Sequence, residues 1–223
     1  MNKKIKIILT GATGMVGEGV LLECLANDTV AEVLVVNRSA SGKSHPKLKE
    51  LIVSDFLQIE KFKEELKGYD ACFWCAGKSS VGMNEADYTV LTYDTTMVFA
   101  EVLKELNPEL VFNFISGGHT DSSEQGKVMW ARVKGKTENA LLKLFGNNSY
   151  NYRPALMKPT KGQKNFRGYN KFAPTVLFPL LKLFYPYLTL QQIGRAMINA
   201  TTLGFEKQVL EVEDIRKLSE IGA

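Results

Sequence analysis

The sequence predicts a doubly wound parallel sheet with helices on both faces, in a single domain of 223 residues. Short, almost continuous apolar runs alternate with stretches of helical periodicity, as in sheets that are buried on both faces. A group of closely spaced glycines joins the first apolar run to the first helical stretch. Apolar residues make up 45% and charged residues 23% of the chain, which is the balance of an ordinary globular domain.

The individual elements follow from the length and period of each run. Six apolar runs predict six strands, at residues 4–10, 32–37, 48–53, 71–75 and 110–116, with the sixth starting at 150–153. Helical periodicity predicts helices at residues 14–26, 85–106 and 127–145, and an amphipathic helix at 189–200. Right-handed connections between such strands give a doubly wound sheet.

The last 70 residues depart from this alternation, and we expect residues 155–223 to form a smaller C-terminal region of helical additions on the substrate side. Residues 172–190 are nineteen mostly apolar residues, nearly enough to span a bilayer. Pro174, Pro179 and Pro186 interrupt them and Lys182 lies among them, which argues against a span. We expect short helices over the carboxyl edge of the sheet; an interfacial anchor or a homodimer surface is the alternative.

The three cysteines are too few for a disulfide framework and indicate a reducing compartment. Cys72 and Cys75 have C-x-x-C spacing, but they lie in a predicted strand, where residues three apart point to opposite faces. We therefore expect no metal site. The N-terminus has two lysines before apolar residues, as a signal peptide does, yet its apolar core is short and contains Lys6. A buried first strand in a cytoplasmic protein is the interpretation we adopt.

The strongest motif is TGATGMVGEGV at residues 10–20, in which Gly11, Gly14 and Gly17 follow a predicted strand and open a predicted helix. Gly11 allows the tight turn, Gly14 lets the backbone approach a pyrophosphate, and Gly17 lets the helix pack close to the sheet. Backbone N–H groups at the start of the helix then attract phosphates. The motif predicts a dinucleotide site, with a tight turn that binds nothing as the alternative.

The end of the second predicted strand indicates which dinucleotide binds. An acidic residue there would accept hydrogen bonds from the ribose hydroxyls of NAD. The sequence has Asn37 and Arg38 instead, and Arg38 can pair with a 2′-phosphate, with Lys43 as a second cation. We expect NADP(H) to be favoured, with NAD(H) as the alternative cofactor.

Further features extend the pattern: Asp55 after the third strand, CAG at 75–77 after the fourth, Ser116 ending the fifth, Lys134 in the next helix and YRPA at 152–155. With the glycine motif, they resemble the atypical and extended short-chain dehydrogenases. The resemblance lies near the NAD-dependent epimerase/dehydratase and NmrA-like groups, closest to the oxidoreductase-like Tat-interacting protein subfamily. It implies that the cofactor contacts Asp55 and Phe56 at the adenine and Cys75, Ala76 and Gly77 at the adenosine ribose. Lys134 would contact the nicotinamide ribose, and the motif residues Gly11, Thr13, Gly14, Met15, Val16 and Gly17 the phosphates.

The chain departs from these families at the catalytic position. By the resemblance, a serine, here Ser116, positions the substrate, and Lys134 lowers the pKa of a tyrosine four residues earlier. In this sequence the position of that tyrosine is occupied by Trp130. Residues four apart share a helix face, so the geometry survives, but an indole N–H cannot transfer a proton near neutral pH.

Three interpretations stay open: a cofactor-binding protein or sensor without turnover, an enzyme with a substitute donor, or a site in which Trp130 stacks on an aromatic ligand. The candidate substitute donors are Ser116, Lys134, Tyr88, Tyr93 and the loop residue His119. The substrate is a small molecule that the sequence does not identify.

A basic stretch from Lys127 to Lys171 holds eleven cations and only one carboxylate, Glu138. It indicates either an anionic partner or a solvated surface. A nucleic-acid-binding motif does not accompany it, so we expect no nucleic-acid partner.

Overall fold

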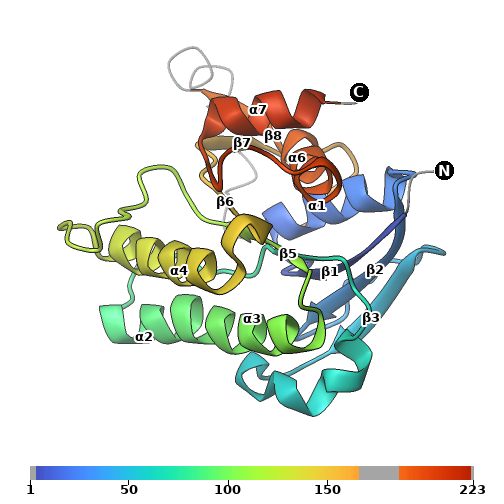
Figure 1. The fold of residues 1–223 in the computed structure, drawn as a ribbon, viewed down its shortest axis with the longest axis horizontal. Coiled ribbons are helices and arrows are strands. Elements are labelled where there is room, and N and C mark those ends of the chain that lie inside the picture. The colour runs from blue at the N-terminus through green and yellow to red at the C-terminus, as the bar shows by residue number, and fades with distance from the viewer. Residues whose placement is uncertain (1–3, 166–185, 222–223) are drawn as a thin grey trace.

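The computed structural model describes residues 4–165 and 186–221, and Figure 1 shows their fold. A seven-stranded sheet has the order β3-β2-β1-β4-β5-β6-β9, and every neighbouring pair is parallel. The strands are β1 (Ile5–Thr10), β2 (Val30–Asn37), β3 (Leu48–Ile52), β4 (Ala71–Trp74), β5 (Val111–Ile115), β6 (Ser149–Tyr152) and β9 (Val209–Leu210). The predicted doubly wound α/β fold is confirmed, with one strand more than predicted.

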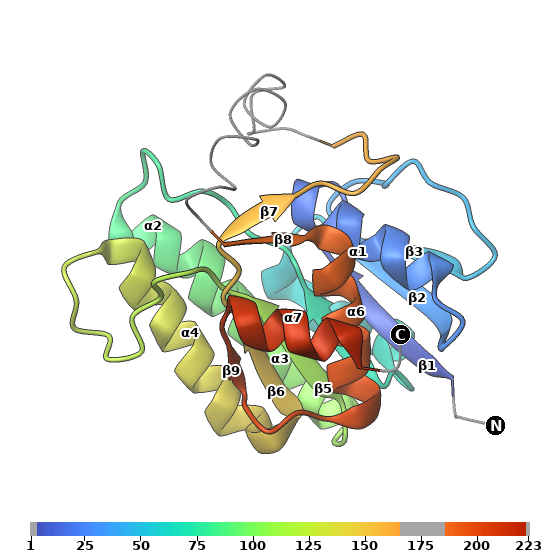
Figure 2. The same ribbon diagram turned by 90° about the horizontal axis from the view of Figure 1, so that it is seen from above.

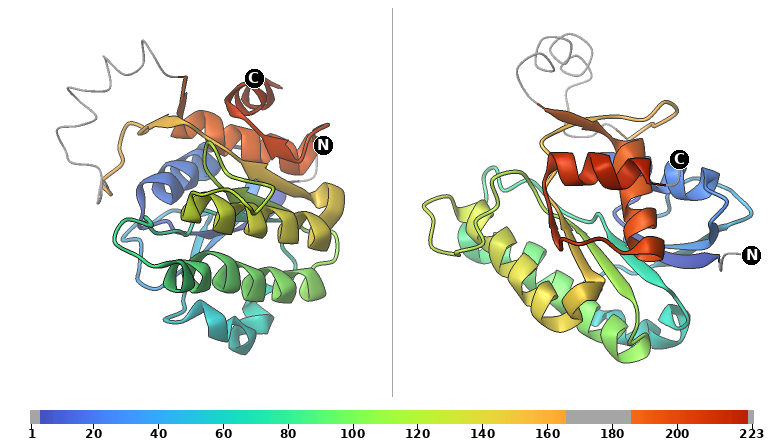
Figure 3. Two further views of the ribbon diagram at one scale, coloured as in Figure 1. Left: turned by 90° about the vertical axis from the view of Figure 1, so that its left-hand side faces the viewer. Right: turned by 45° about the horizontal axis from the view of Figure 1, so that its top comes forward.

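Helices cover both faces of the sheet, as two views in Figure 3 show. One face carries α1 (Met15–Ala26), α6 (Leu190–Leu203) and α7 (Val212–Glu220). The other carries α3 (Thr95–Leu106), α4 (Met129–Phe145) and the 3₁₀ segment Phe56–Leu66. The central strands β1, β2, β4 and β5 send alternate side chains to the two cores, which explains why β1 and β2 are almost continuously apolar.

The predicted helix 85–106 is interrupted. It consists of α2 (Glu85–Thr89), a π-helical turn (Val90–Asp94) and α3 in direct succession. The hydroxyl groups of Thr95 and Thr96 donate to the carbonyl oxygens of Val90 and Thr92 at 2.8 and 2.5 Å. The predicted bounds of the helix are confirmed. The π-helical turn inside it was not predicted, because the periodicity of apolar side chains does not reveal a local change in backbone hydrogen bonding.

The C-terminal region contains more structure than predicted. The strands β7 (Leu156–Lys158) and β8 (Tyr187–Thr189) form a second, two-stranded parallel sheet. This sheet lies near the N-terminal ends of α1 and α6 (Figure 2). The expectation of short helices over residues 172–190 lies mostly outside the described residues, and its described end is β8 followed by the start of α6. None of the described helices is long and apolar enough to cross a membrane.

The predicted helix 189–200 is α6, which begins with a capping box. The hydroxyl of Thr189 accepts the N–H of Gln192, while the side chain of Gln192 accepts the N–H of Thr189. Buried Ile193 and Met197 pack α6 into the core that α1 and the sheet share. The C-terminal region therefore completes one face of the fold.

Candidate functional site

The glycine turn joins β1 to α1 at the carboxyl edge of the sheet. Gly11 has φ +74°, and a Cβ there would lie 2.6 Å from the carbonyl carbon and oxygen of Cys75. A Cβ on Gly17 would collide with the carbonyl of Gly11. Asn37, at the end of β2, accepts the N–H groups of Gly11 and Ala12 on its Oδ1 at 3.0 and 3.2 Å. Only glycine fits at these two positions, and the turn is fixed from the neighbouring strand.

Gly14 differs from the other two glycines because protein packing does not require it. It is the exposed N-cap of α1, in extended conformation, and its added Cβ would contact only the Gly11 carbonyl oxygen at 3.4 Å. As a glycine it has no side chain with which to cap the helix. The N–H groups of the first turn and the positive end of the helix dipole therefore face an open space that suits an anionic phosphate.

The end of β2 presents hydrogen-bond donors rather than a carboxylate. The Nδ2 of Asn37 has no hydrogen-bond partner among the described residues, although the residue is only 3% exposed. Arg38, next along the chain, is exposed. Lys43 was expected as a second cation for a phosphate, but its Nζ forms an ion pair with Glu18 at 2.8 Å. Arg38 is thus the exposed donor at the end of β2, because the amide of Asn37 is buried.

The residues expected around an adenosine follow β3 and β4. Asp55 caps the 3₁₀ segment by accepting the N–H of Leu57 at 3.0 Å. The ring of Phe56 points into the core against Trp74 and Phe99. Only the backbone of Phe56 is therefore placed to flank a ligand. After β4, Cys75 and Ala76 are half-buried and Gly77 is exposed, and the N–H of Ala76 donates to Thr10 Oγ1 at 3.1 Å.

Ser116, which follows β5, uses its hydroxyl internally. Thr120 Oγ1 donates to the Gly117 carbonyl oxygen at 2.8 Å, so its only hydrogen is engaged. In the 3.0 Å contact between the two hydroxyls, Ser116 Oγ must therefore be the donor and Thr120 Oγ1 the acceptor. Ser116 is 5% exposed. To donate to a substrate oxygen, Ser116 would have to break this bond, and sequence reasoning missed Thr120 as its partner.

Trp130 and Lys134 lie together beside Gly117. A Cβ placed on Gly117 would be 3.7 Å from Trp130 Cζ3 and 3.9 Å from Lys134 Nζ. Lys134 Nζ donates to the carbonyl oxygen of Ser116 at 2.8 Å. Burial lowers the pKa of Lys134 to about 8, an effect that the carboxylate of Glu138 opposes. The structure thus gathers the three predicted catalytic residues, with Gly117 as a neighbour that the sequence did not single out.

The other candidate proton donors are less well placed. Tyr88 is 3% exposed, and burial raises its pKa although a hydrogen bond with Thr92 opposes the shift. Tyr93 belongs to the π-helical turn, and Lys136 Nζ lies 4.2 Å from the centre of its ring. His119 is exposed, in a left-handed conformation with φ 65°. Lys134 is therefore the titratable group that the structure places beside Trp130.

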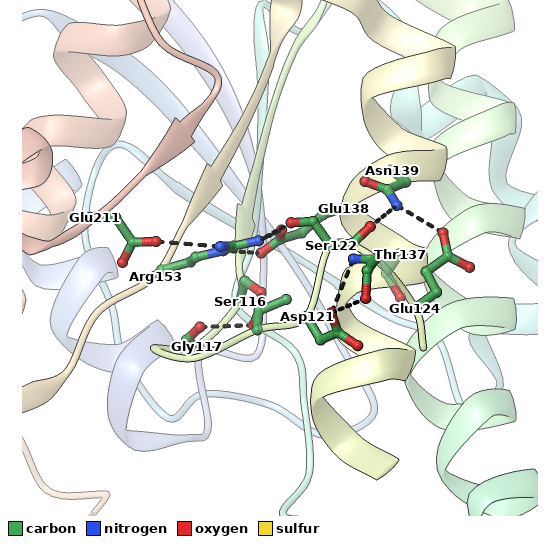
Figure 4. A network of polar contacts seen from close by, with 12 residues as sticks. Ser116, Gly117, Asp121, Ser122, Glu124, Thr137, Glu138, Asn139, Arg153 and Glu211 are labelled. Atoms are coloured by element: carbon green, nitrogen blue, oxygen red, sulfur yellow. Dashed lines mark hydrogen bonds and ion pairs between the residues drawn. The ribbon is translucent and has the colours of Figure 1, made fainter. Parts of the chain in front are cut away.

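A network of polar contacts holds the loop between β5 and α4 (Figure 4). Glu138, fully buried on α4, accepts from Arg153 Nε at 3.0 Å and from Arg153 Nη2 at 2.5 Å. Arg153 Nη2 also donates to Ser122 Oγ at 2.6 Å, and Nη1 reaches Glu211 at 3.3 Å. Asn139 Nδ2 donates to the Ser122 carbonyl oxygen at 3.0 Å. One arginine thus joins the loop beside the site to β6, α4 and the C-terminal region.

The basic stretch 127–171 is not a uniform cationic surface over its described part. Arg153 is paired as above, and Arg132 forms an ion pair with Glu85 at 2.7 Å. Lys134 donates to backbone carbonyl oxygens, and Lys136 lies over the ring of Tyr93. Four of its cations therefore serve internal contacts; an anionic partner for the rest stays a prediction.

Two further features could form sites: the cysteine pair and a cavity. Cys72 packs into the core beneath α3, whereas Cys75 faces the core beneath α1, so they point to opposite faces as expected. Among the described residues, no three His, Cys, Asp or Glu side chains could hold a metal ion together. A cavity of about 820 Å³ opens at the amino edge of the sheet, between Asp70, Asn107 and Thr202. It lies at the opposite edge from the glycine turn.

The fold and the turn together define the class: a Rossmann-like α/β protein with a dinucleotide-type glycine turn after its first strand. Within that class, the chain belongs to the NAD dependent epimerase/dehydratase family, whose model matches residues 7–143. The resemblance to the short-chain dehydrogenases is thus confirmed at the level of this family. A search of curated proteins found no match.

Several solved structures have the same fold. WbmF of Bordetella bronchiseptica, in complex with NAD+, has a TM-score of 0.69 at 16% identity and covers 97% of this chain and 77% of its own. ADP-L-glycero-D-manno-heptose-6-epimerase of Helicobacter pylori has 0.69 at 13%, covering 99% and 82%. A double mutant of the dTDP-glucose 4,6-dehydratase DesIV of Streptomyces venezuelae, with NAD bound, has 0.69 at 16%, covering 96% and 79%. At these identities the likeness shows the fold.

Proposed function

We propose that this protein binds NADP(H) at the carboxyl edge of its sheet and does not reduce carbonyl groups by the tyrosine mechanism. The proposal for binding rests on the glycine turn, on the open N-terminus of α1 and on the complexes of structural neighbours with NAD+. The observation that carries the catalytic half is that Trp130 lies beside Lys134 and Gly117, where the family mechanism needs a phenol.

The preference for NADP(H) rests on the donors at the end of β2. A ribose with free hydroxyls needs an acceptor there, whereas a 2′-phosphate needs donors. The exposed guanidinium of Arg38 supplies donors, and Asn37 Oδ1 offers no acceptor because the glycine turn already uses it. When bound, the cofactor would supply the hydride. The chain's own contribution is to hold its phosphates with the first turn of α1 and with Arg38.

Cofactor titrations test this half of the proposal. Isothermal titration of the wild-type protein should give tighter binding of NADPH than of NADH. A charged hydrogen bond to phosphate contributes about 1.5–3 kcal/mol, or roughly ten- to a hundredfold in Kd. Arg38→Ala should remove most of that ratio, whereas Lys49→Ala, at an exposed lysine on β3, should keep it. Equal Kd values for the two cofactors in the wild-type protein would contradict the preference.

The catalytic half follows from proton chemistry. Transfer of a hydride to a carbonyl carbon leaves an alkoxide that needs a proton, and an indole N–H does not supply one near neutral pH. We expect the wild-type protein to show little or no NADPH oxidation with a broad panel of aldehydes and ketones. Robust turnover that survives Trp130→Phe would contradict this half, because another group would then supply the proton.

A second function is favoured by one observation. Lys134 Nζ lies beside Gly117, as Trp130 does, and burial lowers its pKa to about 8. Its proton can therefore move near neutral pH. In this alternative the protein is an oxidoreductase or epimerase in which Lys134 replaces the phenol. Lys134→Arg, which keeps the positive charge and raises the pKa, should then abolish turnover while NADPH still binds. Turnover retained in Lys134→Arg would exclude this alternative.

Within the family, we place the chain near the NmrA-like and Tat-interacting protein groups. The placement is supported by CAG at 75–77, by Lys134 in α4 and by YRPA at 152–155, whose arginine holds the loop beside the site.

A further inference from the structure

The side chain of Glu18 is a fully buried carboxylate near the glycine turn. It lies in the first turns of α1 and is 0% exposed. It accepts the N–H of Lys164 at 3.0 and 3.1 Å and the N–H of Asn165 at 2.7 Å, and it pairs with Lys43 Nζ at 2.8 Å. Burial alone would raise the pKa of Glu18, but these donors outweigh it and leave the pKa below its usual value. The carboxylate of Glu18 therefore links α1 to the backbone at residues 164–165 and to the loop that carries Lys43.

The segment that Glu18 holds has a second attachment to the same helix. Gln163, which is 8% exposed, donates from Nε2 to the carbonyl oxygen of Met15 at 2.7 Å. Its Oε1 accepts the N–H of Thr160, which curls the segment upon itself. Gly19 makes room beneath, since a Cβ there would lie 3.0 Å from Gln163 Oε1. Residues 160–165, which we call the strap, thus lie across the first turns of α1.

The strap is attached at the end of α1 where the phosphates are proposed to bind. Met15 is the first residue of α1, directly after Gly14, and its carbonyl oxygen accepts the side chain of Gln163. Within the strap, Thr160 Oγ1 is buried and has no partner among the described residues. Upstream, the strap continues from β7 and so connects the cofactor helix to the C-terminal region.

We infer that the strap retains the bound dinucleotide and that Glu18 is the positioning residue that fastens it, an inference that rests on the proposed cofactor function. A ligand held under a fastened segment leaves only when the segment lifts, so the fastening acts on the dissociation rate more than on association. Glu18 itself does not touch the cofactor in this view. It acts through the backbone of Lys164 and Asn165 and through Lys43.

Glu18→Gln tests the inference, because glutamine keeps the shape of glutamate and removes the charge. Charged hydrogen bonds are about twice as strong as neutral ones, so we expect about a tenfold faster release of NADPH in stopped-flow displacement, with less than a twofold change in association. Hydrogen exchange of the amides of Lys164 and Asn165 should accelerate as well, with or without cofactor. Glu23→Gln is the matched control, since Glu23 lies on the same helix, 8% exposed, and pairs with Arg195 from α6 at 2.8 Å.

The outcomes separate the two proposals. Release from Glu18→Gln at the wild-type rate, or equal acceleration in Glu23→Gln, would overturn the role of the strap and leave cofactor binding intact. Wild-type protein that binds neither NADPH nor NADH would overturn the proposed function itself. If Glu18→Gln does not fold, Gln163→Ala loosens the strap at its second attachment, and it must also release NADPH faster if the inference holds.

Discussion

Replacing Arg153 with methionine should destabilise the protein strongly, because the arginine is the bidentate partner of a carboxylate that has no access to water. Glu138 is 0% exposed, and Arg153 reaches it from both Nε and Nη2. Removing one member of a buried ion pair leaves an uncompensated charge and costs about 3–5 kcal/mol. For a domain of this size, that corresponds to a Tm roughly 6–20 °C lower.

A matched variant isolates the buried part of the network. Glu211 contacts the same arginine at 3.3 Å but is 58% exposed, so Glu211→Gln should cost less than about 1 kcal/mol. Urea unfolding followed by circular dichroism gives both values. In Arg153→Met, hydrogen exchange of the loop at residues 117–127 should also rise, because Ser122 loses its contact with the guanidinium.

A comparison of the two variants decides the matter. A cost below about 1 kcal/mol for Arg153→Met, or an equal cost for Glu211→Gln, would refute the reasoning, because only Arg153→Met leaves a buried carboxylate without its bidentate partner.

Three further predictions concern the site. Gly17→Ala should lower stability by about 1–3 kcal/mol and abolish NADPH binding in a titration, because its Cβ would enter the turn after β1. Gly68→Ala is the control: its φ of +79° makes alanine cost about 1–2 kcal/mol of stability, but it lies at the opposite edge of the sheet with nothing within 4 Å of the added Cβ, so NADPH binding should persist. The buried amine of Lys134, with its pKa lowered to about 8, should lose its proton near pH 8 in an NMR titration of labelled lysines, whereas exposed lysines stay charged; titration of Lys134 together with the exposed lysines would contradict its burial. The double variant Gly117→Ser, Trp130→Tyr should fold with wild-type stability, because a Cβ at position 117 meets only ordinary contacts. It should gain NADPH-dependent reductase activity over either single variant. The absence of a gain would show that the pocket has adapted to indole.

The sheet was predictable from the sequence because its strands are long and apolar on both faces. β9 was not, since it has two residues, and neither were β7 and β8, which have three residues each and pair across a long interval of sequence. The helix α7 could have been found. Its capping box, in which Glu211 and Asp214 exchange hydrogen bonds with each other's backbone, is a sequence-level signal that helical periodicity follows.

The site was predictable where a local motif determines it. Gly11 and Gly17 are required by the turn that their spacing predicts. The roles of Asn37 and Lys43 depend instead on neighbours that only the folded chain brings together: the glycine turn for Asn37 and Glu18 for Lys43. Sequence patterns carry no record of such pairings, because each partner lies some 25 residues away along the chain.

The interlocking of the two ends of the chain bears on how the protein is made. The core beneath α1 includes Leu190, Ile193 and Met197 of α6 and Ile215 and Leu218 of α7. During synthesis, β1, β2 and α1 leave the ribosome long before these residues do. One apolar face of the nascent sheet therefore stays uncovered until α6 and α7 have emerged, and during this period it is exposed to aggregation and to chaperones. A transcript cut short before α6 should yield an aggregating fragment rather than a smaller working protein.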